Sequence, residues 1–219
     1  MKSNQDLQKD VQDAIKWEPL LNAAEIGVIA QNGVVTLTGI VNSYAKKLEA
    51  EKAAKNVSGV KAVVEEITIN YGSYGKKTDK DIADDVLAAL KMNWEVPDEK
   101  VKIKVENGRV TLEGELKWNY QKEAAKKAIK YLVGITGITN NIQIKSEMID
   151  AVEREDIECA LERNWSIDDD DIQVKVSGNN VSLNGTVGSL YQKDEAERIV
   201  WNAPGVWSVD NELLVDYES

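Results

Sequence analysis

Apolar and polar residues alternate along three stretches of the chain, and a two-residue turn sequence interrupts each alternation. In the middle stretch the apolar residues lie on both sides of Asn107-Gly108, at Val101, Ile103, Val105, Val110 and Leu112. A period of two is typical of strands with one buried face, and Asn-Gly strongly favours a tight type I′ turn. The same pattern surrounds Asn32-Gly33 and Gly178-Asn179. The sequence therefore predicts three β-hairpins, each with one face buried and the other exposed to water.

These hairpins belong to three copies of one repeat that align without internal gaps. Each hairpin ends at a glycine, and the spacings between Gly39, Gly114 and Gly185 are 75 and 71 residues. Before the first two hairpins apolar residues recur at i, i+4, i+7 and i+8, so we expect each copy to open with an amphipathic helix. A second helix is predicted after each glycine, over residues 44–57, 119–132 and 190–203, and a last strand over 61–69, 136–144 and 207–215.

We therefore predict an α+β fold of three tandem α-β-β-α-β units, each a small mixed three-stranded sheet with two helices on one face. The predicted units are residues 1–72, 76–146 and 147–219. Trp17, Trp94 and Trp165 follow the first helix of each unit. Packing at the edge of their own unit is the simpler prediction for these side chains, and packing between neighbouring units is the alternative.

Recurring glycines are predicted to serve the backbone. Gly39, Gly114 and Gly185 allow a sharp strand-to-helix turn with positive φ, although a glycine there could also let a ligand approach the backbone. Gly59, Gly134 and Gly205 are predicted to stop the second helix, where a left-handed backbone is needed. Gly134-Ile135-Thr136-Gly137 also matches the GxxG loop of KH modules, but that loop should be backed by basic residues. We therefore predict no nucleic-acid binding.

The composition excludes several classes of function. The 219 residues include no histidine, which removes Ser-His-Asp and Cys-His nucleophile systems and the usual zinc sites. Cys159 is the single cysteine, so no intramolecular disulfide forms. No phosphate loop, dinucleotide fingerprint or pair of catalytic carboxylates stands out. We predict a protein without enzymatic activity, cofactor or metal site.

The chain is also predicted not to be transmembrane. No apolar run approaches the roughly 18 residues that cross a bilayer. The N-terminal residues lack the apolar core of a secretory signal. We therefore expect a cytoplasmic protein as the sequence is written, or a periplasmic one if a signal has been removed.

Two recurring sequences carry a resemblance to a known family. The first ends the hairpin, at Val35–Gly39, Val110–Gly114 and Val181–Gly185, and the second ends the second helix, at Val57–Val60, Leu132–Ile135 and Ala203–Val206. Together they resemble the BON domain, named for bacterial osmotically inducible and nodulation proteins, in three tandem copies. The resemblance implies an α-β-β-α-β fold without catalytic residues. It also implies a role in binding phospholipid membranes or cell-envelope partners, often under osmotic stress.

Charge is distributed unevenly among the three units. Residues 1–73 have a net charge of −1, residues 74–145 of +3 and residues 146–219 of −13. The middle unit is thus the predicted place for an anionic partner. The candidate site is on its second helix, where a row of lysines and two aromatic residues occur: Trp118, Tyr120, Lys122, Lys126 and Lys130. Lysines beside aromatic rings are recruited by anionic lipid surfaces, whereas a solvated helix face with a hydrophobic staple is the alternative.

The sequence Asp168-Asp169-Asp170-Asp171 suggests calcium, but it lacks the spaced ligands, glycine and closing glutamate of an EF-hand loop. A solvated turn is the simpler interpretation, with weak cation binding as the alternative. Our preferred hypothesis is a stress-related module that binds phospholipid surfaces or envelope components through the middle unit. The alternatives are a scaffold that self-associates or binds another protein, the acidic third unit meeting the basic middle unit of a neighbour, and a small-ligand or cation sensor.

Overall fold

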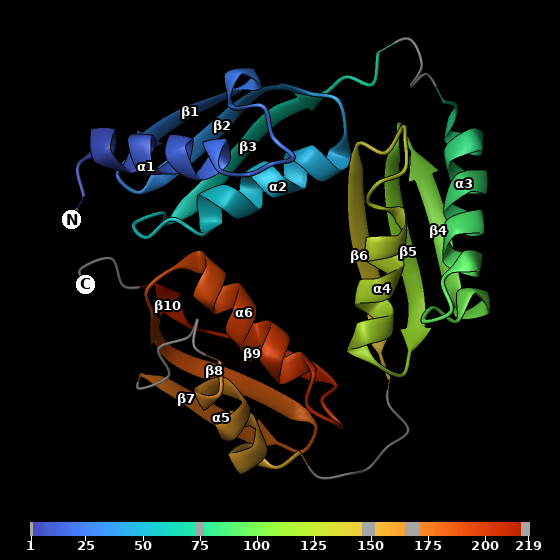
Figure 1. Ribbon diagram of the computed structural model, residues 1–219. Coiled ribbons are helices and arrows are strands. Elements are labelled where there is room, and N and C mark those ends of the chain that lie inside the picture. Colours follow the sequence, from blue (N-terminus) through green and yellow to red (C-terminus); the bar gives the residue numbers. More distant parts are fainter. Residues whose placement is uncertain (1, 73–76, 146–151, 165–170, 216–219) are drawn as a thin grey trace. The chain divides into compact units, whose positions relative to one another are not determined.

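Three small sheets account for the fold, as Figure 1 shows in the computed structural model. The structure describes residues 2–72, 77–145, 152–164 and 171–215. We call the parts around the three sheets module 1 (2–72), module 2 (77–145) and module 3 (152–164 and 171–215). Each module has the helix, hairpin, helix and closing strand that the sequence predicts, so the α+β prediction of three α-β-β-α-β units is confirmed.

Module 1 contains α1 (Asn4–Lys16), a short 3-10 helix η1 (Ala23–Glu25), β1 (Ile26–Gln31), β2 (Val34–Val41), α2 (Tyr44–Lys55) and β3 (Ala62–Ile69). The strand order is β1-β2-β3. The hairpin turn has φ of 52° at Asn32 and 83° at Gly33, as a type I′ turn requires. The Asn4 side chain at the start of α1 accepts a hydrogen bond of 2.8 Å from the Asn32 backbone N–H, which ties the helix to the hairpin.

Module 2 contains α3 (Asp79–Met92), η3 (Asp98–Lys100), β4 (Val101–Glu106), β5 (Arg109–Leu116), α4 (Asn119–Ile129) and β6 (Gly137–Ile144). β4 pairs antiparallel and β6 parallel with the central strand β5, which makes the sheet mixed. Asp79, at the position equivalent to Asn4, accepts hydrogen bonds from the N–H groups of Asn107 (2.8 Å) and Gly108 (2.9 Å). Both modules thus use the first residue of their first helix to hold the hairpin turn.

Module 3 contains α5 (Arg154–Glu162), β7 (Ile172–Ser177), β8 (Asn180–Val187), α6 (Leu190–Trp201), β9 (Ser208–Asn211) and β10 (Leu214–Val215). Its turn differs from the other two, because Gly178 has a φ of 61° and Asn179 has no positive φ. That is the pattern of a type II′ turn, in which glycine takes the first central position. The strand predicted over 207–215 is split into β9 and β10, both parallel to β8.

The core of each module lies between the sheet and its two helices. Leu37, Leu112 and Leu183 occupy the same position on the three central strands and are fully buried. The facing alanines of the second helices, Ala50, Ala125 and Ala196, are also fully buried. Small side chains there let the helix approach the sheet closely. Burying each leucine stabilises its module by about 1.5–3 kcal/mol.

An asparagine connects the second helix to the closing strand in modules 2 and 3. The Asn140 amide donates a 2.9 Å hydrogen bond to the Lys122 carbonyl of α4 and accepts one of 3.3 Å from the Ile142 N–H. Asn211 makes the equivalent bonds to Lys193 and Leu213, of 2.9 and 3.3 Å. In module 3 this asparagine is the last residue of β9, whereas in module 2 the equivalent asparagine lies within the unbroken β6.

The glycine at the end of each hairpin has positive φ, with values of 128° at Gly39, 146° at Gly114 and 126° at Gly185. A Cβ at these positions would collide with the backbone carbonyl that precedes the hairpin, which belongs to Glu25, Lys100 and Asp171 respectively. Space and backbone conformation therefore both favour glycine here.

Candidate binding surfaces

The candidate site lies on α4, the second helix of module 2, and begins at the first turn of this helix. Trp118 has extended backbone and caps α4, and its N–H donates a 3.3 Å hydrogen bond to the Gln121 side chain. Ala124, Ala125 and Ile129 form the buried stripe of this helix. With 3.6 residues per turn, the opposite side of α4 is left to lysine and tyrosine side chains.

The predicted lysine row does not stand fully in solvent. Lys122, Lys126 and Lys130 are each half-buried along one flank of α4. No carboxylate among the described residues forms an ion pair with any of the three. The Lys130 ammonium lies 4.7 Å from the centroid of the Tyr131 ring, within the range of a cation–π contact. The three lysines thus have no ion-pair partner in the described part of the chain.

Lys122 occupies a position that has a structural role in the other modules. The equivalent Lys47 and Lys193 each donate an ammonium hydrogen bond of 2.8 Å to a backbone carbonyl, that of Ile67 on β3 and that of Leu213 between β9 and β10. These bonds connect helix and sheet. For this reason we do not group Lys122 with Lys126 and Lys130 as a candidate binding residue.

Tyr120 does not share a face with Lys122. The two residues are about 200° apart around the helix, because successive residues turn by about 100°. Tyr120 lies instead on the same side of the helix as Lys127, two turns further on, and both are exposed. Lys126 and Lys130 border this side, and the exposed Tyr131 follows the helix. We call these residues, Tyr120, Lys126, Lys127, Lys130 and Tyr131, the α4 surface. Lys127 and Tyr131 were missed from the sequence, although a helical projection would have found Lys127.

A second group of exposed apolar side chains lies at one end of module 2. Trp94 and Met92, at the end of α3, are 89% and 86% exposed. The end of α3 and the start of α4 lie at the same end of the sheet (Figure 1), since the start of β4 pairs with the end of β5. Trp94 and Met92 are therefore on the end of the module where Tyr120 lies.

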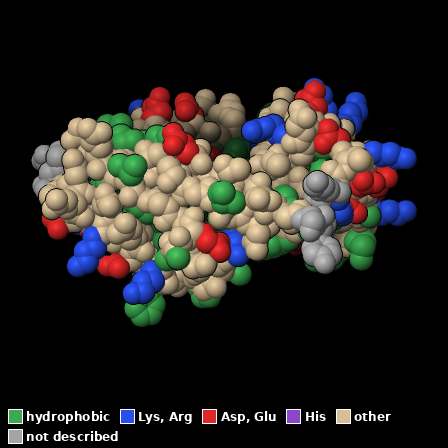
Figure 2. Space-filling view, turned by 90° about the horizontal axis from the view of Figure 1, so that it is seen from above, with side chains coloured by type: hydrophobic (Ala, Val, Ile, Leu, Met, Phe, Trp, Pro, Cys, Tyr) green, Lys and Arg blue, Asp and Glu red, His purple; other side chains and the backbone are tan. Residues whose placement is uncertain are grey.

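The prediction that the tryptophans pack at the edge of their own unit is wrong for two of the three. Trp17 is 83% exposed, close to the 89% of Trp94, so neither ring is covered by its module. Trp165 lies outside the described residues. The sequence could not show this exposure, because the helix pattern before a tryptophan is the same whether its ring is exposed or buried. Figure 2 shows hydrophobic side chains reaching the surface among charged ones on the face that it draws.

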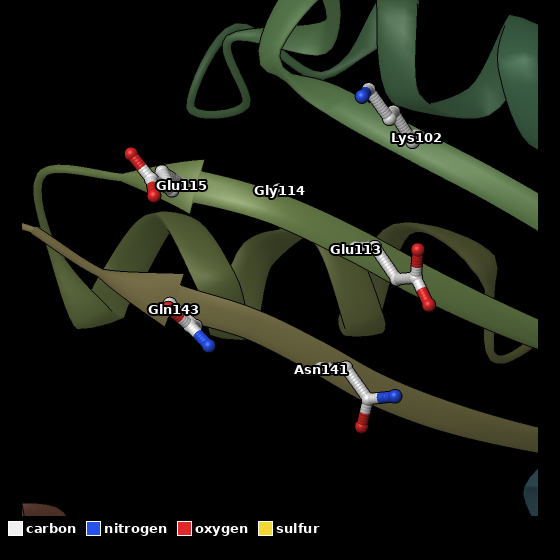
Figure 3. A pocket seen from close by; sticks show the side chains of 6 residues that line it. All are labelled: Lys102, Glu113, Gly114, Glu115, Asn141 and Gln143. Carbon is white, nitrogen blue, oxygen red and sulfur yellow. The ribbon is translucent and has the colours of Figure 1, made fainter.

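The face of the module 2 sheet that lies away from the helices has a shallow hollow of about 410 Å³ (Figure 3). Across the strands, Lys102 is opposite Glu113, and Glu113 is opposite Asn141. Glu115 pairs with Lys145 at 2.9 Å. On the same face a hydrogen bond from Lys104 to Glu106 raises the pKa of the lysine. The two signs of charge alternate here, so even with Arg109 this face offers little excess positive charge to an anionic surface.

Most of the acidic run of the third unit, Asp168, Asp169 and Asp170, lies outside the described residues. Asp171 is exposed and is 3.4 Å from the Thr186 hydroxyl. Cys159 is an exposed free cysteine on α5. Among the described residues no three carboxylate or cysteine side chains are grouped so that they could hold a metal ion.

Comparison with known proteins agrees with this geometry. The family model of the BON domain matches the chain three times, at residues 3–71, 78–146 and 150–217. The chain belongs to the BON domain family. It is 29% identical over 129 residues to osmotically-inducible protein Y of Escherichia coli strain K12, an alignment that covers 57% of this chain and 64% of the relative. This BON protein thus matches somewhat less than two thirds of that relative's length.

Solved structures add less. The C-terminal domain of CdsD, described as the structural protein of the type III secretion system of Chlamydia trachomatis, is 17% identical, and the match covers 98% of this chain and 100% of the other. Its TM-score is 0.26, and that of a second CdsD structure is 0.25, so neither superposition carries an argument. Within the described residues, no helix has both the length and the apolar character needed to span a membrane.

Proposed function

We propose that this BON protein is a non-catalytic binding protein that docks on anionic phospholipid surfaces through module 2. The observation that carries the proposal is the exposed Trp94 and Met92 at the end of the module where Tyr120 begins the α4 surface. Tryptophan and tyrosine rings favour the headgroup region of a bilayer. Trp94, Met92 and Tyr120 all lie within residues 74–145, the third of the sequence that has a positive net charge, +3.

The charge argument gives an expected magnitude. A lysine close to an anionic membrane contributes about 1 kcal/mol. Lys126, Lys127 and Lys130 would then supply about 3 kcal/mol, or a factor of roughly 100 in affinity. The net charge of the whole chain is −11, so non-oriented adsorption would be repelled. Binding must therefore be local and oriented, with the α4 surface toward the lipid.

Co-sedimentation with vesicles of phosphatidylglycerol and phosphatidylcholine, compared with phosphatidylcholine alone, tests the proposal. We expect binding to the anionic vesicles, a loss of roughly 100-fold in Lys126→Glu/Lys127→Glu/Lys130→Glu, and a smaller loss in Trp94→Ala/Met92→Ala. The matched control is Lys102→Glu/Lys104→Glu/Arg109→Glu, which changes the charge equally on the opposite face of the same module. Equal loss in this control, or no binding by the unmodified protein, would show that the α4 surface is not the docking site.

We further propose that the protein acts in the cell envelope under osmotic stress. Support comes from the family and from the name of the Escherichia coli relative, which describes it as osmotically inducible. Quantitative immunoblotting of cells before and after a shift to high osmolarity tests this, and we expect a rise in abundance. Unchanged abundance would remove the stress role without affecting the proposed lipid contact.

A further inference from the structure

The three sheets expose faces of different chemistry. In a sheet with one face covered by helices, the residues that point away from the core are expected to be polar. Module 2 has Lys104, Arg109 and Thr139 at three such positions, which lie 10 and 5 residues before Gly114 and 25 after it. The same spacings from Gly185 lead to Lys175, Asn180 and Asp210 in module 3.

Module 1 departs from this pattern at all three positions. The same spacings from Gly39 lead to Ile29, Val34 and Val64. Their side chains are 59%, 38% and 42% exposed, so no described part of the chain covers them. We call this set, with Thr36 and Thr38 between them on β2, the module 1 sheet face.

The fold does not explain these apolar residues. Branched aliphatic residues are favoured in strands, but the sister modules form the same hairpin with the same register while holding charged or polar residues there. In module 1 Ile29 is opposite Thr36 and Gln31 is opposite Val34, so Ile29 and Val34 are diagonal neighbours on adjacent strands. Val64 is on β3, on the other side of β2. The three residues thus lie on one face of the sheet and on all three of its strands.

We propose that the module 1 sheet face is a self-association surface that packs against the same face of a second copy of this chain. Two apolar sheet faces pack readily with their strands nearly aligned, at a separation of about 10 Å. Contact between identical patches closes as a twofold dimer. Among the described residues, the equivalent faces of modules 2 and 3 are polar, so the matching apolar sheet face is that of another copy.

Electrostatics favour this part of the chain for contact between copies. The net charge is −11 for the whole chain but only −1 for residues 1–73, so two copies meet here with little repulsion. The face holds no lysine or aromatic ring to attract it to lipid, and the exposed Glu66 side chain on β3 would oppose an anionic membrane. A second protein copy is therefore a better occupant than a bilayer.

The size of the face predicts a weak dimer. With eight residues in β2, the face is about 26 Å long and three strands, or about 14 Å, wide. Two such faces bury about 700–800 Å², below the roughly 1,200 Å² of standard stable interfaces. We therefore expect a dimer that forms at high micromolar concentration and dissociates on dilution.

Sedimentation velocity of the full chain between about 1 and 500 μM tests the proposal. We expect the weight-average sedimentation coefficient to rise with concentration. The variant Ile29→Lys/Val34→Arg/Val64→Thr, which takes the residues of module 2, should dimerise at least about tenfold more weakly. Asn180→Arg, on the equivalent face of module 3, is the control and should dimerise like the unmodified protein.

A chain that stays monomeric up to the highest concentration, or a variant that associates as strongly as the unmodified protein, overturns the proposal. Circular dichroism shows whether the variant is folded. If it is not, Ile29→Thr alone replaces it, with an expected dissociation constant at least about threefold higher. Vesicle binding is measured separately with Ile29→Thr, which adds no charge and leaves the α4 surface intact, and it should not change.

Discussion

Asn140 offers a direct test of how the α4 surface is held in place. Its side chain bonds to the Lys122 carbonyl at 2.9 Å and to the Ile142 N–H at 3.3 Å, so it joins helix and strand across a gap of 18 residues in sequence. Replacing Asn140 by alanine removes both bonds, each with a net contribution of about 0.5–1.5 kcal/mol. Such a loss costs about 1–3 kcal/mol. Because the residue is only half-buried, we expect about 2 kcal/mol.

Hydrogen exchange followed by mass spectrometry measures this cost in one module at a time. A loss of about 2 kcal/mol should accelerate the exchange of peptides from α4 and β6 roughly 30-fold. Peptides from modules 1 and 3 provide an internal reference, since their contacts are unchanged. Asn211→Ala should produce the same effect in α6 and β9 of module 3.

Asn141→Ala is the matched control for this experiment. Asn141 is the next residue on β6, but it is exposed and lines the hollow on the opposite face of the sheet. Its substitution should leave exchange in α4 unchanged. Equal acceleration in Asn140→Ala and Asn141→Ala, or none in either, would refute the conclusion that the Asn140 side chain holds α4 to the sheet.

Two further predictions concern stability. Asp79→Ala removes the hydrogen bonds from the Asn107 and Gly108 N–H groups, which costs about 1–2 kcal/mol. Hydrogen exchange in the β4–β5 hairpin should therefore be roughly 5- to 30-fold faster, whereas Lys80→Ala should have no effect. In module 3, hydrogen bonds from Arg198 lower the pKa of Glu195. A carboxylate with a lowered pKa stabilises the fold above the pKa of the unfolded chain, and this contribution is lost as the pH falls through the lower pKa of the folded state. Below about pH 4.5, α6 of the unmodified protein should therefore lose protection more steeply than α6 of Glu195→Gln, and parallel curves would contradict this.

The hairpins and helices could be predicted from the sequence because their patterns are local. Leu112 is flanked by alternating residues that report its burial directly, and Asn107-Gly108 marks the turn without reference to the rest of the chain. Helix ends were predicted less well, since α4 ends at Ile129 and not at 132. The break between β9 and β10 could not be predicted, and the Asn211 contact does not explain it, because Asn140 makes the same contact within the unbroken β6.

The positions of the candidate residues were predicted only in part, because some of their properties depend on tertiary contacts. The i, i+4, i+8 spacing correctly places Lys122, Lys126 and Lys130 along one flank of a helix. It does not show that the equivalents of Lys122 bond to the sheet, which depends on the closing strand. The exposure of Trp94 likewise depends on which neighbours the fold brings near it. These are tertiary properties, and no local pattern contains them.

Repetition within one chain separates what the fold requires from what it merely permits. Positions that face the core hold the same kind of residue in all three modules, as Leu37, Leu112 and Leu183 do. Outward positions are free to differ, and they differ by module: apolar at Ile29, basic at Lys104 and Lys175. Since one fold tolerates each choice, the fold itself does not fix these outward residues. A three-module BON protein can therefore assign different contacts to different modules, with lipid docking on the helices of module 2 and self-association on the sheet of module 1 as the assignments that the experiments above test.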